Sequence, residues 1–149
     1  MIWFDIWKKH VIWAEQRRND VYPDSKGIPT VGIGHNLISG PKEDIPAITG
    51  FTISDERVDQ LFEEDSQSAI HDTRKLFGDI FDSWTDNRKA AIVDLMFNMG
   101  FTTFITFTPT IAHIRAGEWE DVAKHLEGSK WFRDVKRRGP KVVKMIREG

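Results

Sequence analysis

The sequence predicts a mainly α fold of the α+β class, in which a small antiparallel β lobe, a long connecting helix and a helical C-terminal lobe form two lobes. Three observations support this prediction. Apolar residues recur at helical spacing over most of the chain. Glycines, prolines and a β-branched run gather between residues 19 and 50, which is typical of turns and short strands. One amphipathic stretch then continues for about six helical turns, long enough to connect two lobes.

The composition excludes several classes of protein. A chain of 149 residues that is 40% hydrophobic can bury the core of one domain, so disordered and low-complexity classes are excluded. The absence of cysteine excludes a disulfide scaffold and a thiolate zinc site. No apolar run approaches the roughly 18 residues of a transmembrane helix, and the N-terminal residues lack the pattern of a secretory signal. The formal net charge of −2 argues against a surface tuned as a whole to nucleic acid.

The first half of the chain is expected to form a helix, the β lobe and the connecting helix. Residues 1–15 have apolar positions at helical spacing, and we expect this helix to pack with the C-terminal lobe. Residues 16–53 contain the turn-rich β lobe. Ser54 followed by two acids predicts the N-cap of the connecting helix, which we place at residues 54–78.

The second half, residues 79–149, is expected to form the helical lobe of the same single domain. The stretch 84–99 is apolar on almost every side, as in a helix at the centre of a core. Thr108, followed by proline, is a predicted N-cap, and a further helix starts at Trp119. Pro140 opens the last predicted helix.

The segment that carries chemistry is residues 15–35, EQRRNDVYPDSKGIPTVGIGH. It places one carboxylate at a helix end, Glu15, a second in a turn, Asp24, and a hydroxyl at the start of a strand, Thr30. Glycoside hydrolysis requires two carboxyl groups, because one donates a proton to the leaving oxygen while the other works on the opposite face of the sugar ring. By spacing alone, such a pair in a chain with 23 acids is more often a solvated surface pair.

The whole string resembles the catalytic region of the bacteriophage lysozymes of glycoside hydrolase family 24, whose pattern is E-x8-D-x5-T followed by G-x-G-H. Here that pattern is Glu15, Asp24, Thr30 and residues 32–35, without insertion or deletion. The resemblance covers about nine-tenths of the chain, and only the loop from Ser39 to Ile53 departs clearly, being shorter than in the best-known member of the family. Later family landmarks follow in the same order at residues 88–91, 96–100, 107–110, 117–119 and 129–132.

The resemblance implies a lysozyme fold and hydrolysis of the β-1,4 bond between N-acetylmuramic acid and N-acetylglucosamine in bacterial peptidoglycan, with no cofactor. It implies that Glu15 is the general acid, and that Asp24 and Thr30 hold and activate the attacking water, which inverts the anomeric carbon. It also implies that Arg138 orients the general acid, Glu15. The implied substrate-binding residues are His35, Phe97, Asn98 and Thr110.

Several of these positions also have a purely structural interpretation. Arg138 can belong to a solvated basic face, His35 can close the β hairpin, and Phe97 can be a core residue. Asp94 is the single acid between Ala90 and Met99, in the most hydrophobic predicted helix, where it could be buried and paired, and no role follows for it from the sequence.

Other chemistries find no support in the sequence. The glycines at 32 and 34 lack the third glycine of a dinucleotide-binding loop. The five histidines, at positions 10, 35, 71, 113 and 125, do not have the spacing of metal ligands, so no metal site is expected.

The resemblance also carries expectations about partners and location. The partner is bacterial peptidoglycan, without nucleic acid or stable membrane insertion, and the protein is expected to be a monomer. It would be made in the host cytoplasm without a signal peptide and reach the periplasmic or cell-wall peptidoglycan through a separate holin or export system. A tail-associated muramidase or an exported bacterial muramidase fits the sequence equally well.

The sequence leaves two other functions open. A lytic transglycosylase cleaves the same bond without water, and the water-holding pair Asp24 and Thr30 argues against it. A non-catalytic wall-binding or structural module could keep the fold, but it would have no need of an intact Glu15, Asp24 and Thr30 set.

The charges are unevenly distributed along the chain. Residues 54–86 carry ten acids and three bases, whereas residues 130–149 carry eight bases and two acids. A basic C-terminal region could steer the protein toward an anionic wall polymer, although a solvated helix face is the simpler explanation.

Overall fold

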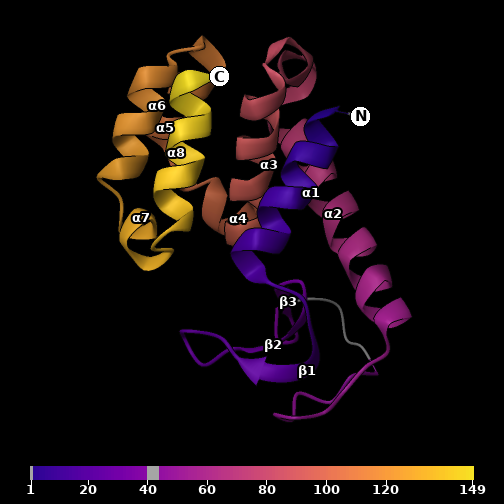
Figure 1. Ribbon diagram of the computed structural model, residues 1–149. Coiled ribbons are helices and arrows are strands. Elements are labelled where there is room, and N and C mark those ends of the chain that lie inside the picture. The colour runs from indigo at the N-terminus through magenta and orange to yellow at the C-terminus, as the bar shows by residue number, and fades with distance from the viewer. Residues whose placement is uncertain (1, 40–43) are drawn as a thin grey trace. The chain divides into compact units, whose positions relative to one another are not determined.

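The structure is a computed structural model that describes residues 2–39 and 44–149 (Figure 1). The described chain is mainly helical and carries one small antiparallel sheet, so the predicted α+β class is confirmed. It divides into two compact units. Residues 11–67 form the first, here called the β unit, and residues 1–10 with 68–149 form the second, the helical unit. Helices α1 (Ile2–Glu15) and α2 (Asp55–Phe77) contribute residues to both units.

The sheet of the β unit contains three strands in the order β1-β2-β3. Strand β1 (Arg18–Pro23) pairs antiparallel with β2 (Pro29–Gly32), and β2 pairs antiparallel with the short β3 (His35–Asn36). In the first pair Tyr22 lies opposite Thr30. The buried core of this unit consists of Val21, Val31, Ile45 and Leu61.

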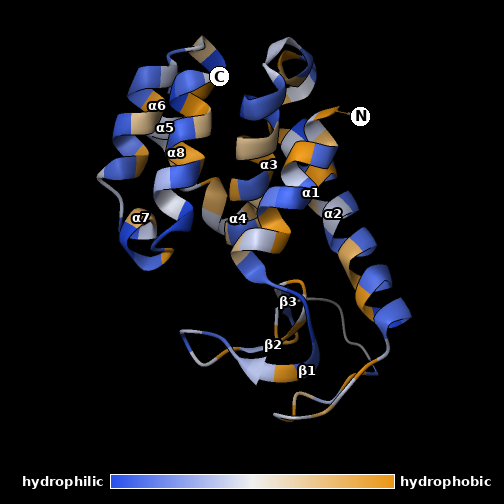
Figure 2. Cartoon of the chain, in the orientation of Figure 1, coloured by the Kyte–Doolittle hydropathy of each residue, from blue (hydrophilic) through white to orange (hydrophobic). Residues whose placement is uncertain are grey.

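Helix α2 begins and ends where its sequence signals place it. The Ser54 hydroxyl accepts a hydrogen bond from the Arg57 backbone N–H at 3.1 Å, as an N-cap does. The helix ends before Gly78, whose φ of +64° favours glycine. Figure 2 shows hydrophilic and hydrophobic residues alternating along α2, as expected for an amphipathic helix.

The helical unit is built around α3 (Asp86–Met99), whose residues from Ala90 to Met96 are all buried. Helix α6 (Trp119–Glu127) packs against both α5 (Thr108–Ala116) and α8 (Arg138–Glu148), and α8 also contacts α3 (Figure 1). Val142, Val143 and Ile146 form the buried face of α8, as its spacing predicts. The remaining helices of this unit are α4 (Phe101–Phe104) and α7 (Lys130–Asp134).

Some helix boundaries differ from the predicted ones. Helix α3 begins at Asp86 and not at 84, because the Thr85 hydroxyl accepts from the Arg88 N–H and caps the helix there. Thr108 is the first residue of α5, and its cap position is Phe107. Helix α8 begins at Arg138, two residues before Pro140. The 3-10 turn η1 (Gly78–Ser83) and the short helices α4 and α7 are not predicted, because segments this short show no apolar repeat.

None of the helices in the described ranges is both long enough and apolar enough to cross a bilayer. The loop 39–53, which was singled out by the resemblance, includes residues 40–43, and these lie outside the described residues.

Candidate active site

The Asp24 carboxylate is fixed by the turn that connects β1 to β2. Its Oδ1 accepts hydrogen bonds from the backbone N–H groups of Lys26, at 2.8 Å, and Ile28, at 2.9 Å. The backbone of Asp24 also bonds to Ile28 and to Gly27, which closes the turn. Because these contacts hold Oδ1, the second oxygen, Oδ2, is left as an acceptor for another partner.

The hydroxyl group of Thr30 already donates its proton in a hydrogen bond within the protein. Its Oγ1 donates to the Ile28 carbonyl oxygen at 2.8 Å, and the side chain is buried. A hydroxyl that donates its proton to a carbonyl can only accept from a further ligand. The same backbone position, Ile28, thus donates to Asp24 and accepts from Thr30, so one residue orients both predicted water-binding groups.

Glu15 is the last residue of α1, and its side chain lies directly against the backbone of Gly34. A Cβ added at Gly34 would lie 2.7 Å from the Glu15 Cδ and 2.9 Å from its Cγ, and closer still to Oε2. The φ of Gly34 is +68°, a conformation that also favours glycine. The G-x-G-H segment therefore makes room for the Glu15 carboxylate.

We expect Gly34→Ala to lower activity by about 100-fold, because displacing a reacting group by about 1 Å can cost that much. Gly50→Ala is the matched control, since Gly50 also has a positive φ, +92°, but meets nothing within 4 Å of an added Cβ. The rate of peptidoglycan clearing and the melting temperature should be measured for both variants. Equal activity in the two would show that the approach of Gly34 to Glu15 is not important.

Tyr22 interacts with both predicted catalytic carboxylates, although the sequence did not single it out. Burial raises the pKa of its hydroxyl, and the negative charges of Glu15 and Asp24 raise it further. Both carboxylates therefore act electrostatically on this one side chain. Tyr22 is the only tyrosine of the chain, and its signal in the sequence is its position two residues before Asp24. The structure adds that it lies opposite Thr30 in the sheet.

His35 lies buried in the β unit beside helix α2. Its Nδ1 is 2.6 Å from Oδ2 of Asp65, and the histidine is only 5% exposed. This contact joins β3 to helix α2, which is a structural role other than the predicted closing of the hairpin. Its contact with a sugar stays a prediction.

Asp94 lies fully buried in the helical unit and binds three side chains. Its carboxylate accepts from Trp7 Nε1 at 3.2 Å and from Arg138 at 2.8 and 2.9 Å, and it lies 2.9 Å from His10 Nε2. Burial alone would raise the pKa of Asp94, but the Arg138 charge and the hydrogen bonds from His10 and Arg138 outweigh burial and hold it well below its usual range. The acid without a predicted role is therefore a buried structural anion.

Arg138 is also buried, at 5% exposure, so its interpretation as part of a solvated basic face is wrong. Its two contacts with Asp94 form the bidentate arrangement that fixes a guanidinium group in position. The predicted role of Arg138 toward Glu15 stays a prediction, because Glu15 belongs to the β unit.

The other predicted substrate residues lie in the helical unit. Phe97 and Asn98 are half-buried near the end of α3, and Thr110 is buried in the first turn of α5. Asn98 Oδ1 accepts from Trp131 Nε1 at 2.9 Å, and the Phe97 ring meets the Trp7 ring edge-on, with centroids 5.3 Å apart.

The structure thus brings Glu15, Asp24, Thr30 and His35 into the β unit, and it assigns Phe97, Asn98, Thr110 and Arg138 to the helical unit. Within the β unit, the Glu15 side chain packs against Gly34, and the predicted water-binding residues Asp24 and Thr30 both form hydrogen bonds with the backbone of Ile28.

Comparison with known proteins decides the family, because the sequence model of the phage lysozymes matches residues 14–147. The chain belongs to the phage lysozyme family. The match includes the Glu15, Asp24 and Thr30 segment and extends into α8. The chain is therefore a lysozyme-type glycosidase that acts on peptidoglycan.

Three relatives illustrate the range of this phage lysozyme family. Probable T4-type lysozyme 1 of Dictyostelium discoideum is 27% identical over 155 residues, which cover 92% of this chain and 91% of that protein. The pre-baseplate central spike protein Gp5 of Enterobacteria phage T4 is 28% identical over 91% of this chain, but the match covers only 28% of its own length. The endolysin of Salmonella phage P22 is 32% identical over 93 residues, 60% of this chain and 58% of the endolysin.

Proposed function

We propose that this lysozyme hydrolyses the β-1,4 bond between N-acetylmuramic acid and N-acetylglucosamine, with inversion at the anomeric carbon. The observation that carries the proposal is the arrangement of acceptors around Ile28. Oδ1 of Asp24 is held by two backbone N–H groups, and the Thr30 hydroxyl donates its proton to a carbonyl. A water molecule bound there would donate one proton to Asp24 and the other to Thr30, which leaves a lone pair of its oxygen for the attack.

The proposed reaction is a single displacement. The Glu15 carboxyl donates its proton to the glycosidic oxygen as the bond from that oxygen to the anomeric carbon breaks. The water oxygen forms a new bond to the anomeric carbon from the opposite face, and Asp24 takes the proton that the water loses. Each of the two products ends in a new hydroxyl group. After the reaction Glu15 is ionised and Asp24 is protonated, and proton exchange with solvent returns both groups to their starting states.

The remaining roles belong to the same proposal. Arg138, held by Asp94, would orient the acid, while His35, Phe97, Asn98 and Thr110 would contact the saccharide. The half-buried Phe97 ring and the Asn98 amide suit N-acetyl sugars, which offer CH faces and amide groups.

We also propose that the protein is an endolysin-type enzyme for host lysis, a monomer that is made in the cytoplasm and reaches the wall through a separate holin or export system. Its similarity to the P22 endolysin supports this. The similarity to the T4 spike protein supports a tail-associated muramidase as the second possibility.

The stereochemistry of the first product tests the proposed reaction. Purified peptidoglycan or a chitooligosaccharide should be digested in an NMR tube and the new reducing ends followed by proton NMR before mutarotation. We expect the α anomer to appear first, because displacement on a β-linked sugar by water inverts the carbon. An initial β anomer would show retention and contradict the role of Asp24 as the base.

A further inference from the structure

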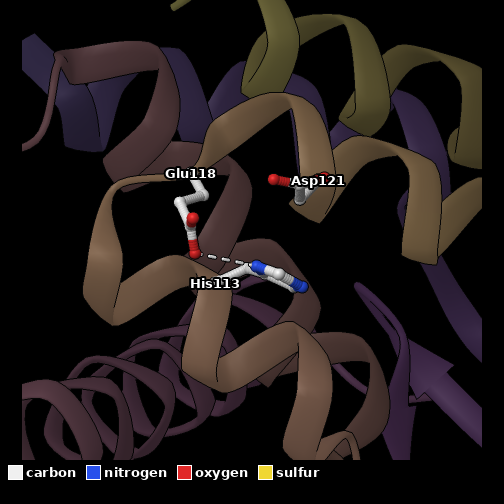
Figure 3. A group of neighbouring side chains, drawn as sticks. All are labelled: His113, Glu118 and Asp121. Atoms are coloured by element: carbon white, nitrogen blue, oxygen red, sulfur yellow. Dashed lines mark hydrogen bonds and ion pairs between the residues drawn. The ribbon is translucent and has the colours of Figure 1, made fainter.

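Three potential metal ligands converge at the turn between α5 and α6. His113 lies in the last turn of α5, Glu118 is the residue before α6, and Asp121 lies in the first turn of α6. One nitrogen or oxygen atom from each of the three lies within 4.8 Å of the others. Figure 3 shows the Glu118 carboxylate directed at the His113 ring, with Asp121 beside them. The histidine spacing in the sequence misses this cluster because two of its members are carboxylates.

The backbone of the turn fixes the first two residues relative to each other. The Glu118 N–H donates to the His113 carbonyl at 2.9 Å, and the Gly117 N–H donates to the Ile114 carbonyl at 3.1 Å. Gly117 has a left-handed conformation, with φ of +70°. This is the Schellman arrangement of a helix end, so the positions of His113 and Glu118 do not depend on flexible side chains alone.

The charges at this turn are not balanced. The neighbouring acids of α6, Glu120 and Glu127, each bind Arg147 at 2.7 Å. The Asp121 side chain, by contrast, forms no hydrogen bond or ion pair with any residue in the described ranges 2–39 and 44–149. Two carboxylates therefore meet at a single imidazole without a bound lysine or arginine, and a bound cation would lower their mutual repulsion.

We propose that His113, Glu118 and Asp121 bind a divalent first-row transition metal ion, and that Zn²⁺ fits this set best. Zinc takes imidazole nitrogen and carboxylate oxygen at about 2.0–2.2 Å, so two tetrahedral donors lie about 3.3 Å apart. Nδ1 of His113 and Oε1 of Glu118 are 3.0 Å apart, close to that separation. Calcium and magnesium prefer oxygen ligands, which argues against them.

The ion would replace the proton shared by His113 and Glu118 and draw Asp121 inward. It would join the end of α5 to the start of α6, and water would complete its coordination. The His125 ring lies against that of His113, with centroids 4.9 Å apart, and restricts how the ligand ring can turn. Because the ion binds the folded turn, it should raise the melting temperature. This site is independent of the proposed catalytic residues.

The test is zinc binding by the whole protein after dialysis against EDTA. Titration calorimetry should give one ion per chain for the wild type and for the control His71→Gln, which removes an exposed histidine of α2. For His113→Gln and for Asp121→Asn we expect an affinity lower by at least about tenfold, because even the loss of a residue that only supports a ligand costs that much. Zinc should also shift the His113 ring nitrogen resonances in proton–nitrogen NMR spectra.

Melting curves in EDTA establish that the variants are folded before they are titrated. The proposal is overturned if the wild type binds no zinc stoichiometrically, or if His113→Gln binds it as tightly as the wild type. A loss of affinity in His71→Gln as large as in His113→Gln would also overturn it, since binding would then follow histidine content and not this cluster.

Discussion

Glu15→Gln should abolish most of the lytic activity, with a fall of about 1,000-fold or more in the rate of peptidoglycan clearing. Glutamine has nearly the same shape but cannot donate an acidic proton, and general acid catalysis contributes about 10²- to 10⁴-fold. The fold should be unaffected, because Glu15 is only partly buried at the end of α1. The measurement is the loss of turbidity of purified peptidoglycan, together with a melting curve of each protein.

The matched control for this experiment is Glu56→Gln. Glu56 is an exposed glutamate in the first turn of α2, in the same β unit, and its substitution should leave the clearing rate within about twofold of wild type because surface changes have small effects. If Glu15→Gln cleared peptidoglycan as fast as Glu56→Gln, the assignment of the acid would be wrong.

Asp94→Asn should produce the largest loss of stability, about 3–5 kcal/mol in the free energy of unfolding. Removing one partner of a buried ion pair leaves the other charge uncompensated, and here that charge belongs to Arg138, which is 5% exposed. The introduced amide could still accept a hydrogen bond from Trp7 but could not neutralise the guanidinium. Thermal unfolding followed by circular dichroism should show a melting temperature lower by about 10 °C.

The effect of Asp94→Asn should also depend on pH. The pKa of Asp94 is lowered in the folded state, so its contribution is complete at pH values above the unfolded value of 3.8 and declines as the pH falls below it. The difference in melting temperature between wild type and variant should therefore be constant near neutral pH and narrow in acid. The control is Glu120→Gln, which removes an exposed partner of Arg147 and should change stability little. A difference that does not narrow in acid would contradict the buried-anion interpretation.

The local features of the fold could be predicted from the sequence, because short-range signals determine them. The acids after Ser54 marked the start of α2, and the glycine-rich stretch marked the sheet. Helices α4 and α7 could not be predicted, since four or five residues contain no periodic pattern. The start of α3 was placed two residues too early, because apolar spacing does not show which residue caps a helix.

The candidate site could be predicted as a set of residues but not as a set of contacts. The motif located Glu15, Asp24 and Thr30, whereas the contact of Gly34 with Glu15 depends on where α1 ends in space. The partners of Asp94 could not be identified because they come from segments far away in the chain, at Trp7, His10 and Arg138. Contacts between residues that are far apart in the chain produce no pattern in the spacing of neighbouring residues.

The central claim is that water, held at Asp24 and Thr30, cleaves the glycosidic bond. The most direct test is digestion of purified peptidoglycan by the wild type in heavy-oxygen water, with mass spectrometry of the released muropeptides. We expect every new reducing-end N-acetylmuramic acid to carry one heavy oxygen atom. Products that end in 1,6-anhydro sugars without heavy oxygen would contradict the claim, because the bond would then have been cleaved without water.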